Sequence, residues 1–466
     1  KRKERRLMKE IRTLTTGSVS RNLFFFALPL LLANLLQSFY SVVDMVVVGN
    51  LVGETGLAAI SNASSISFII NSICIGVTMG GTVLTARYQG ANDRQARGET
   101  VRTLFKISLW ASFAVTAAAL AVYRPVLQAM KVPAEAMEDA CGYMRVISLG
   151  TVFVFGYNAA CSVLKGLGDS RSPLGFVAAA AAVNIVLDLA LVGPFHMGTV
   201  GAAYATVFSQ AVSCFLALLH LKRKTAVFDV SIQGRREGSG CLKELLRIGL
   251  PTAIQMVVVN LSYLLVTGML NQFGVAVAAA SGIGLKINTF AGMPCWAVGQ
   301  AVTAMAGQNM GAGDLPRVRR TVKTGLRLNL LVTLASVLTV QLFAGPLVAL
   351  FEPENREVIQ DGILYLRICC GINSLVYAAM YTFDSFAIGA GSAGIAMGNA
   401  LLDAVFVRIP VSWILAFCLD LGAPGVYIGQ AVSPILPAAA GFWYWKRGAW
   451  ASRRPEMKGA EKEERF

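Results

Sequence analysis

The chain has 466 residues, of which 55% are hydrophobic and only 14% carry a charged side chain. Soluble domains have about 25% charged residues, so this composition and the mean hydropathy of +0.60 exclude a soluble protein and indicate an integral membrane protein. The net charge of +15 does not predict a nucleic-acid partner, because the basic residues lie in short segments between apolar runs and not on one soluble face.

Twelve apolar runs are long enough to cross the hydrocarbon core of a bilayer, about 30 Å, which takes roughly 20 helical residues. Backbone polar groups inside lipid must be satisfied within the segment, so we predict an all-α integral membrane protein with twelve transmembrane helices. The predicted spans are residues 23–48, 58–86, 104–124, 145–165, 174–193, 199–221, 248–273, 281–306, 326–350, 363–388, 396–419 and 425–445.

The basic residues predict the orientation of the chain. Most Lys and Arg lie in the two terminal tails and in the connections that follow even-numbered spans, whereas the other connections hold only Arg124, Lys131 and Arg356. Since cytoplasmic loops carry the excess of Lys and Arg, both termini are expected in the cytoplasm. The first apolar run is longer than the core of a cleavable signal peptide, so we expect it to be the first span.

The two halves of the sequence repeat each other at an offset of 221 to 224 residues. The repeated pairs are Leu28-Pro29 with Leu250-Pro251, residues 89–94 with 310–315, Tyr143–Ile147 with Tyr365–Cys369, residues 166–168 with 389–391, and Gly201 and Tyr204 with Gly425 and Tyr427. An even number of spans in each half predicts a parallel 6+6 repeat with two six-helix lobes around a central cavity. The predicted division is an N-terminal tail (1–22), an N-lobe (23–221), a basic linker (222–247), a C-lobe (248–445) and a C-terminal tail (446–466).

Ionisable residues inside a membrane are costly and mark functional sites. In the first span, a polar stripe at helical spacing contains Asn34, Gln37, Ser41 and Asp44, and Tyr40 stands one turn before Asp44. In the fifth span, Asn184 stands one turn before Asp188, so each carboxyl group is expected to have a hydrogen-bonding neighbour.

Both aspartates lie in the middle-to-outer part of the bilayer, where we expect them to meet. A carboxylate withdrawn from water takes up a proton more readily, so the pair is suited to bind and release protons. The alternative is that both aspartates are buried polar residues that tie helices together.

The second half carries less clearly arranged polar residues. Asn260, Lys286, Asp384 and Arg408 are candidates for lining the cavity and contacting the substrate, together with Asn34, Gln37 and Ser41 of the first span. Asp403 and Arg408 are five residues apart and therefore not on one face of an α-helix, so each is expected to pair with another helix. Asp384 is expected near water at the cytoplasmic end of its span. A structural ion-pair network and a transport role are both open for these residues.

Catalytic and metal-binding signatures are missing from the sequence. It has no phosphate-binding loop, no zinc-like spacing among its nine cysteines, and only two histidines, His196 and His220. We therefore predict a protein that is not an enzyme, with no cofactor and no metal site. Prolines 29, 251, 294 and 410 are expected to interrupt helices.

Several of these motifs together resemble the multidrug and toxic compound extrusion (MATE) family. They are Pro29 to Gly49 through Asp44, Gly80-Gly81, Gln89 to Asp93, Leu164 to Ser170 followed by Pro173, Met293-Pro294, and Gln308 to Asp314. The family usually has Arg where Lys165 stands. The resemblance extends over all twelve predicted spans.

The resemblance implies two lobes around a V-shaped cavity, alternating access, and export of cationic or amphipathic small molecules in exchange for H⁺ or Na⁺. Tyr40, Asp44, Asn184 and Asp188 match the cation-coupling cluster of the bacterial DinF-like branch. The NorM-like branch has a glutamate in its seventh span, but residues 257–262 here contain no carboxylate, and Asp384 matches that branch only loosely. We therefore expect H⁺ in preference to Na⁺ as the coupling ion, and we do not assign a Na⁺ site.

The expected protein is a multidrug antiporter in the plasma membrane, the bacterial inner membrane, that functions as a monomer. Its partners are small-molecule substrates and the lipid bilayer, with no nucleic acid. The main alternative is a lipid-linked oligosaccharide flippase of the same superfamily, whose anionic substrate requires basic cavity residues, and only Lys286 and Arg408 are available. An intramembrane enzyme or a channel is a more distant alternative.

Overall fold

The computed structural model describes residues 14–130, 132–224 and 239–452, and every regular element in these ranges is helical. The first half contains α2 (Val19–Leu51), α3 (Glu54–Gly90), α4 (Arg94–Ala129), α5 (Ala134–Leu149), α6 (Thr151–Gly166), α7 (Arg171–Val192) and α8 (Gly198–Lys224). The second half contains α9 (Ser239–Leu270), η3 (Asn271–Phe273), α10 (Val275–Gly311), α11 (Leu315–Leu342), α12 (Ala344–Ala349), α13 (Arg356–Cys369), α14 (Asn373–Gly389), α15 (Ala393–Leu401), η4 (Leu402–Arg408), α16 (Ile409–Trp413), η5 (Ile414–Cys418), α17 (Gly422–Val432), α18 (Ile435–Arg447) and η6 (Ala449–Ser452).

These helices coincide with the predicted spans. Within the described ranges, nine helices are long and apolar enough to cross a membrane, and the bent pairs α5/α6 and α13/α14 raise the number to eleven. The last predicted span, 425–445, corresponds to α17 followed by α18. Both bent pairs bend by more than 40° at their break, 46° in the first half and 49° in the second, so the two halves share this irregularity.

The sequence repeat is explained by a turn that starts a helix in each half. Asp93 accepts a hydrogen bond from the Ala96 N–H at the start of α4, and Asp314 accepts one from the Arg317 N–H at the start of α11. The residue before each aspartate has positive φ, 55° at Asn92 and 74° at Gly313. Repeated residues therefore form the same N-cap, which satisfies backbone N–H groups that a helix start leaves unpaired.

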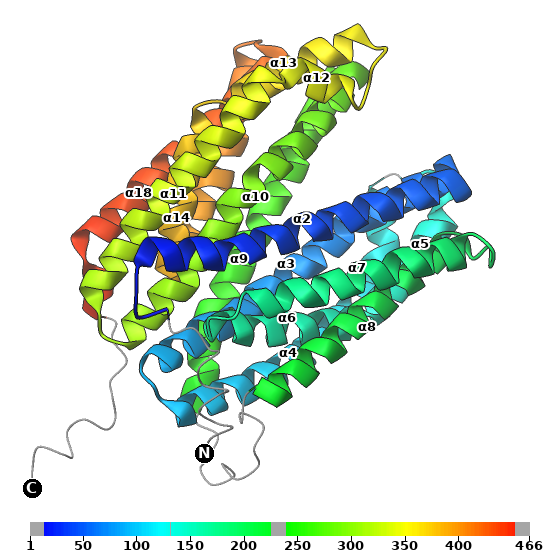
Figure 1. Ribbon diagram of the computed structural model, residues 1–466. Helices are drawn as coiled ribbons and strands as arrows, with labels where there is room; N and C mark the ends of the chain where they lie inside the picture. The colour runs from blue at the N-terminus through cyan, green and yellow to red at the C-terminus, as the bar shows by residue number, and fades with distance from the viewer. Residues whose placement is uncertain (1–13, 131, 225–238, 453–466) are drawn as a thin grey trace, which may run out of the picture.

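The helices form two lobes that are joined at one end (Figure 1). At that end the hydrophobic cores are shared, because the start of α2, with Leu23 and Phe26, packs in one core with α10 and α14 of the other half. Reciprocally, the start of α9, with Leu245 and Ile248, packs in a core with α3 and α6. Each half therefore contributes the beginning of its first long helix to the opposite half.

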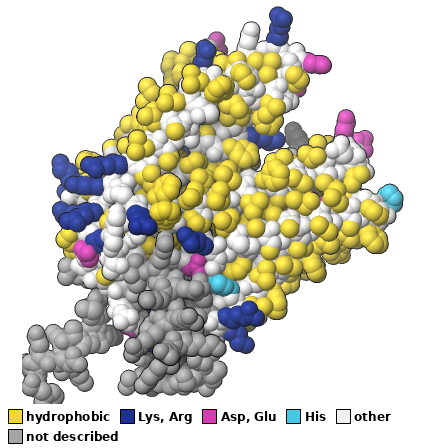
Figure 2. Space-filling view, viewed as in Figure 1, with side chains coloured by type: hydrophobic (Ala, Val, Ile, Leu, Met, Phe, Trp, Pro, Cys, Tyr) yellow, Lys and Arg dark blue, Asp and Glu magenta, His cyan; other side chains and the backbone are white. Residues whose placement is uncertain are grey.

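At the opposite end each lobe has a core of its own. One core is built only from residues of α2–α8, and the other only from residues of α9–α17. The space-filling view shows the surface hollowed between these separate ends, with hydrophobic side chains covering the flanks of both lobes (Figure 2). Lys and Arg gather mainly at the joined end, where Leu14 and Trp450 also lie in one core. By the positive-inside rule, the joined end is cytoplasmic and the open end faces outward.

The expectation that prolines interrupt the helices is wrong for three of them. α2, α9 and α10 continue through Pro29, Pro251 and Pro294, because packing against neighbouring helices holds the chain helical. Pro410 is the second residue of α16, at the point where the winding of the span changes from the π-helix η4 to an α-helix. Of the predicted tails and linker, residues 1–13, 225–238 and 453–466 lie outside the described residues.

Candidate functional site

Two carboxyl groups face each other inside the N-lobe. Asp44 lies on α2 and Asp188 on α7, and these helices pack side by side. The side chains are 8% and 0% exposed, and the two carboxyl groups are close enough for a hydrogen bond if one of them carries the proton. The predicted meeting of these residues is therefore present in the structure.

Three of the four oxygens of this pair have no hydrogen-bond donor among the described residues. Asp44 Oδ1 and both carboxyl oxygens of Asp188 are buried without a hydrogen-bond partner, and neither residue forms a salt bridge within the described part of the chain. Two ionised carboxylates in contact and removed from water repel each other strongly. The arrangement thus requires a proton or another cation between the two groups, which is the property expected of a cation-exchange site.

Polar residues on neighbouring helices surround the pair. Tyr40 lies near Asp44 and within hydrogen-bonding reach of Gln37 on α2 and Gln210 on α8. Tyr143 of α5 lies near both carboxyl groups and within reach of Thr206 on α8. Sequence reasoning missed Tyr143, Thr206 and Gln210, although the repeat of the Tyr143–Ile147 segment at Tyr365 was a signal for the first of them.

The remaining first-half candidates are only partly brought together. Asn34 is half-buried on α2, and Gln37 and Ser41 are exposed. Asn184 is 1% exposed on α7, but its side-chain oxygen and nitrogen have no hydrogen-bond partner. The expected hydrogen bond from Asn184 to Asp188 is therefore absent, and the Asp188 carboxyl group instead lies close to Asp44 of α2.

The candidates of the second half do not converge on one site. Asn260 of α9 donates to the Ser72 hydroxyl of α3 at 2.9 Å, and so links the two lobes. Lys286 is exposed on α10. Asp384 is 3% exposed and accepts a 2.6 Å hydrogen bond from Asn399. The expectation that Asp384 lies near water is wrong, because α14 is packed against α10, α11, α15 and α18 and the Asp384 side chain is buried.

Asp403 and Arg408 pair with each other, which corrects the prediction that they lie on different faces. The Arg408 Nη2 atom lies 2.5 Å from the Asp403 Oδ2 atom, and both residues are almost fully buried. Residues 402–408 form a π-helix, η4, in which hydrogen bonds join residues five apart. This winding places residues five apart on one face, which an α-helical reading of the sequence excludes.

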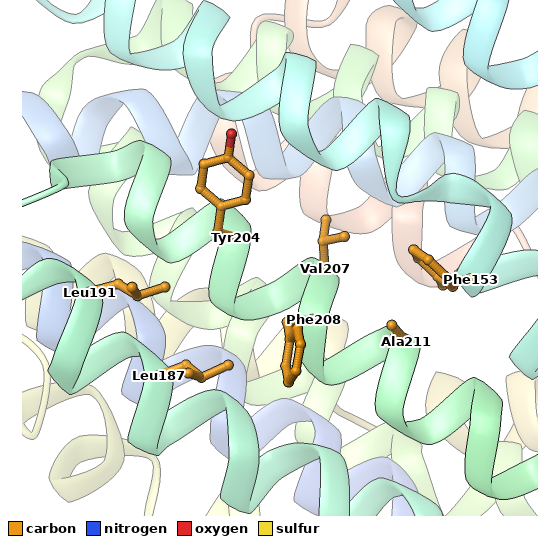
Figure 3. Close-up of a pocket in the computed structure, with 7 residues that line it drawn as sticks. All are labelled: Phe153, Leu187, Leu191, Tyr204, Val207, Phe208 and Ala211. Carbon is orange, nitrogen blue, oxygen red and sulfur yellow. The ribbon is translucent and has the colours of Figure 1, made fainter.

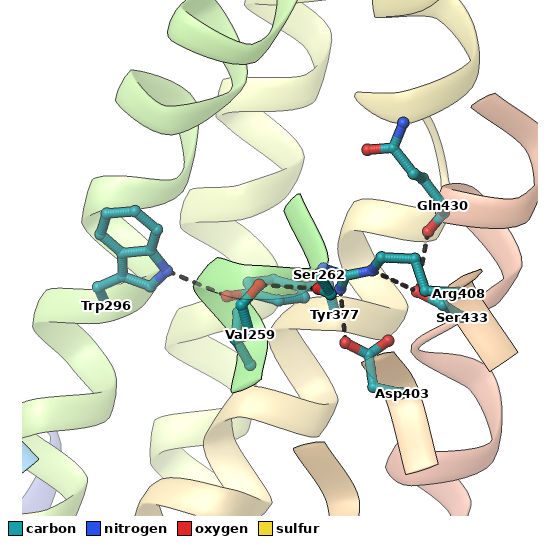
Figure 4. A network of polar contacts seen from close by, with 8 residues as sticks. All are labelled: Val259, Ser262, Trp296, Tyr377, Asp403, Arg408, Gln430 and Ser433. Atoms are coloured by element: carbon teal, nitrogen blue, oxygen red, sulfur yellow. Dashed lines mark hydrogen bonds and ion pairs between the residues drawn. The ribbon is translucent and has the colours of Figure 1, made fainter. Parts of the chain in front are cut away.

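The Arg408 guanidinium is satisfied on all sides within the C-lobe. It donates to Ser262 at 3.0 Å and to Ser433 at 3.4 Å, and lies 4.4 Å from the centre of the Tyr263 ring. Figure 4 shows this network extending from α9 to Asp403 and Ser433, with Trp296 donating to the hydroxyl of Tyr377 beside it. The positive charge of Arg408 is thus neutralised by Asp403.

The N-lobe also contains an apolar pocket of about 420 Å³ between α6, α7 and α8. Its lining is formed by Phe153, Leu187, Leu191, Tyr204, Val207, Phe208 and Ala211 (Figure 3). Leu187 is the sequence neighbour of Asp188, but the only polar side-chain atom among the lining residues is the Tyr204 hydroxyl. The pocket therefore has no group that holds a cation, in contrast to the carboxyl pair.

No group of three or more His, Cys, Asp or Glu side chains suited to a metal ion occurs among the described residues. His220 lies 3.6 Å from Asp169 and interacts with Ser172. All nine cysteines are free thiols.

These features define a multi-pass integral membrane protein with two repeated helical lobes and a buried carboxyl pair, an architecture used by secondary transporters. The family model MatE matches residues 29–190 and 251–414, two segments that begin 222 residues apart and so reproduce the internal repeat. The chain belongs to the MATE family of multidrug efflux transporters, and it is not an enzyme.

Individual proteins are similar to this chain in sequence or structure along nearly its whole length. The "Probable multidrug resistance protein YpnP" of Bacillus subtilis is 27% identical over 447 residues, which cover 94% of this chain and 98% of that protein. A transporter of the MOP superfamily from Pyrococcus furiosus superposes with a TM-score of 0.89 at 22% identity, covering 96% of this chain and 99% of the other.

A further solved structure is described as the outward-facing conformation of a multidrug resistance MATE transporter. It superposes with a TM-score of 0.87 at 22% identity, covering 95% of this chain and 98% of that one. The predicted all-α twelve-span fold, the membrane location and the family are thereby confirmed.

Proposed function

We propose that the protein exports cationic or amphipathic small molecules in exchange for protons, with Asp44 and Asp188 as the coupling groups. The observation that carries this proposal is the contact between two buried carboxyl groups, three of whose four oxygens have no hydrogen-bond donor among the described residues. Such a pair binds one cation or one proton at a time, because either ligand removes the repulsion that favours the other. Competition of this kind is the requirement for antiport.

The proposed cycle follows from this competition. With the cavity open to the cytoplasm, the ionised pair attracts a cationic substrate. With the cavity open to the outside, as the separate outer cores indicate for the present structure, protons reach the pair, neutralise it and release the substrate. The membrane potential favours proton entry by about 2.3 kcal/mol per charge for each 100 mV.

Protons are proposed in preference to sodium because the second half offers no matching ligand set. Residues 257–262 of α9 contain no carboxylate, and the carboxyl groups of Asp384 and Asp403 are already bound to Asn399 and Arg408. The same contrast between the lobes supports assignment to the DinF-like branch. The names of the bacterial relatives, which describe multidrug resistance, support drug-like substrates.

A flippase for an anionic lipid-linked oligosaccharide is less well supported. Its substrate requires uncompensated positive charge in the cavity, but Arg408 is 3% exposed and bound to Asp403. Of the two basic residues considered as ligands for an anionic substrate, only Lys286 then remains.

The proposed coupling predicts that Asp188→Asn loses export of the cationic dye ethidium, by at least tenfold, while the protein remains inserted in the membrane. The amide keeps the shape of the side chain but cannot alternate between a charged and a neutral form. Glu138→Gln, which changes an exposed carboxyl group of the same lobe, is the matched control and should export like the wild type.

The coupling ion is measured with purified protein in liposomes, under an imposed pH gradient or an imposed sodium gradient. Export driven by the pH gradient alone supports the proposal. Export driven only by sodium, or retained in Asp188→Asn, contradicts it.

A further inference from the structure

The cytoplasmic ends of the lobes are closed by a contact that the two halves make reciprocally. A Cβ atom added to Gly90, at the end of α3, would lie 1.8 Å from the backbone oxygen of Gln308. A Cβ atom added to Gly311, at the end of α10, would lie 1.9 Å from the backbone oxygen of Arg87. Only glycine permits such an approach of two backbones. The two glycines are related by the internal repeat.

Two side chains reinforce this contact in the same reciprocal way. The Arg87 guanidinium of α3 donates to the backbone oxygen of Ala390, just past the end of α14. The Gln308 amide of α10 donates to the backbone oxygen of Gly166, at the end of α6, at 2.8 Å. Both acceptors lie at helix C-termini, where carbonyl groups lack intrahelical partners. Each lobe therefore caps a helix of the other lobe.

The Gln308 arm is further held by residues 14–17. The Leu14 N–H donates to Gln308 Oε1 at 2.9 Å, so the buried Gln308 amide uses both its oxygen and its nitrogen. Arg317 at the start of α11 holds this segment by donating to the carbonyl groups of Thr16 and Gly17, each at 2.9 Å. The segment before α2 thus lies directly against the closed cytoplasmic contact.

We propose that these contacts form a cytoplasmic latch, defined as Gly90 with Gly311, the Arg87 arm and the Gln308 arm, which holds the transporter open to the outside. The outer cores of the lobes are separate, and the hydrophobic cores that the lobes share lie at the cytoplasmic end. Opening toward the cytoplasm requires both arms to break. The inference rests on the alternating access in the proposed function, but on neither the substrate nor the coupling ion.

The latch is tested by measuring the separation of the lobes at their cytoplasmic ends. Spin labels on bioorthogonal residues at Gln95 and Arg320, both exposed, report this distance in nanodiscs without disturbing the native cysteines. The variant Arg87→Met with Gln308→Met keeps an unbranched, flexible side chain at both positions but removes the hydrogen bonds of both arms. Each lost hydrogen bond is expected to raise the population with a longer distance roughly tenfold.

Gly311→Ala tests the backbone contact independently and is expected to produce the same longer distance. The matched controls are Arg102→Met, an exposed cytoplasmic arginine, and Gly394→Ala, an exposed glycine with open space around its Cβ position. Should Gly311→Ala fail to fold, the methionine variant decides the question, because it places no new Cβ atom against a backbone oxygen. Wild-type distances in the variant that lacks both arms overturn the proposal, as does an equal change in the controls.

The measurement needs no gradient and no substrate. A failure of proton coupling leaves the distance result intact, and a failed latch appears as an unchanged distance whatever the coupling ion is. A transport assay on the same variants therefore separates the two proposals.

Discussion

At the scale of single residues, Asp188 and Asp403 are buried aspartates in two different environments. Both are at most 1% exposed. Asp403 is neutralised by Arg408 at 2.5 Å, whereas Asp188 faces another carboxyl group and has no hydrogen-bond donor in the described part of the chain. A carboxylate that already has a charged partner holds helices together, and one without a partner must acquire a cation. The environment, and not the residue type, separates the structural aspartate from the proposed coupling aspartate.

The structural role of the Asp403–Arg408 pair leads to a prediction about stability. Arg408→Met leaves Asp403 buried without its partner, which is expected to lower the free energy of unfolding by about 3–5 kcal/mol. Combining Arg408→Met with Asp403→Leu removes the unpaired charge and should recover most of this loss. Thermal unfolding in detergent measures both, with Arg367→Met at an exposed arginine as the control. Equal stability of the single and double variants would contradict the assignment.

At the scale of elements, the eleventh span differs from every other span in the described chain by containing two π-helical segments, η4 and η5. A π-helix accommodates additional residues in a helix and occurs frequently at functional sites. Here η4 brings Asp403 and Arg408 onto one face, and the Arg408 contacts then join this span to α9 and to Ser433. The irregular winding is therefore the cause of the polar network.

This explanation predicts an unusual tolerance to deletion. Removing the exposed residue Val405 leaves Asp403 and Arg408 four apart, a spacing that an ordinary α-helix also places on one face. Removing the exposed residue Leu334 from the regular helix α11 instead rotates all following residues by about 100°. We expect the variant without Val405 to fold, with an unfolding temperature near that of the wild type. The variant without Leu334 should be strongly destabilised. Thermal unfolding measures both. Equal destabilisation would argue against the additional-residue explanation.

At the scale of the whole molecule, the two lobes share cores at one end and have separate cores at the other. The shared end includes the beginnings of α2 and α9, each packed into the opposite half. Because Lys and Arg gather at this end, its assignment to the cytoplasm and the outward opening of the cavity follow from one argument.

The orientation is tested by labelling single cysteines in intact cells. In a Cys418→Ser background, which removes the exposed native thiol, a cysteine at Glu354 should react with a membrane-impermeant maleimide. A cysteine at Gln95 should react only after the cells are broken. Reaction of the Gln95→Cys variant from outside would reverse the assigned orientation and with it the outward-facing state.

The sequence was sufficient for the fold because the constraints that determine it are local. Apolar runs of membrane-spanning length, the distribution of basic residues and the repeat of Asp93 at Asp314 each act within a short segment. The same holds for the carboxyl groups of Asp44 and Asp188, which stand out because a charge inside lipid is costly wherever it occurs. Their meeting was predictable from their similar depth in the bilayer.

The tertiary structure alone decided which polar groups find partners. The pairing of Asp403 with Arg408 depends on a π-helix that no local sequence pattern predicted, and the burial of Asp384 depends on the packing of other helices against α14. Gln210 lies near the carboxyl pair because α8 packs against α7, and Tyr143 lies near it because α5 packs against α8. The reciprocal contacts of Arg87 and Gln308 unite residues far apart in the chain. Hydropathy and period act along the chain, whereas hydrogen bonds between helices depend on how the helices pack.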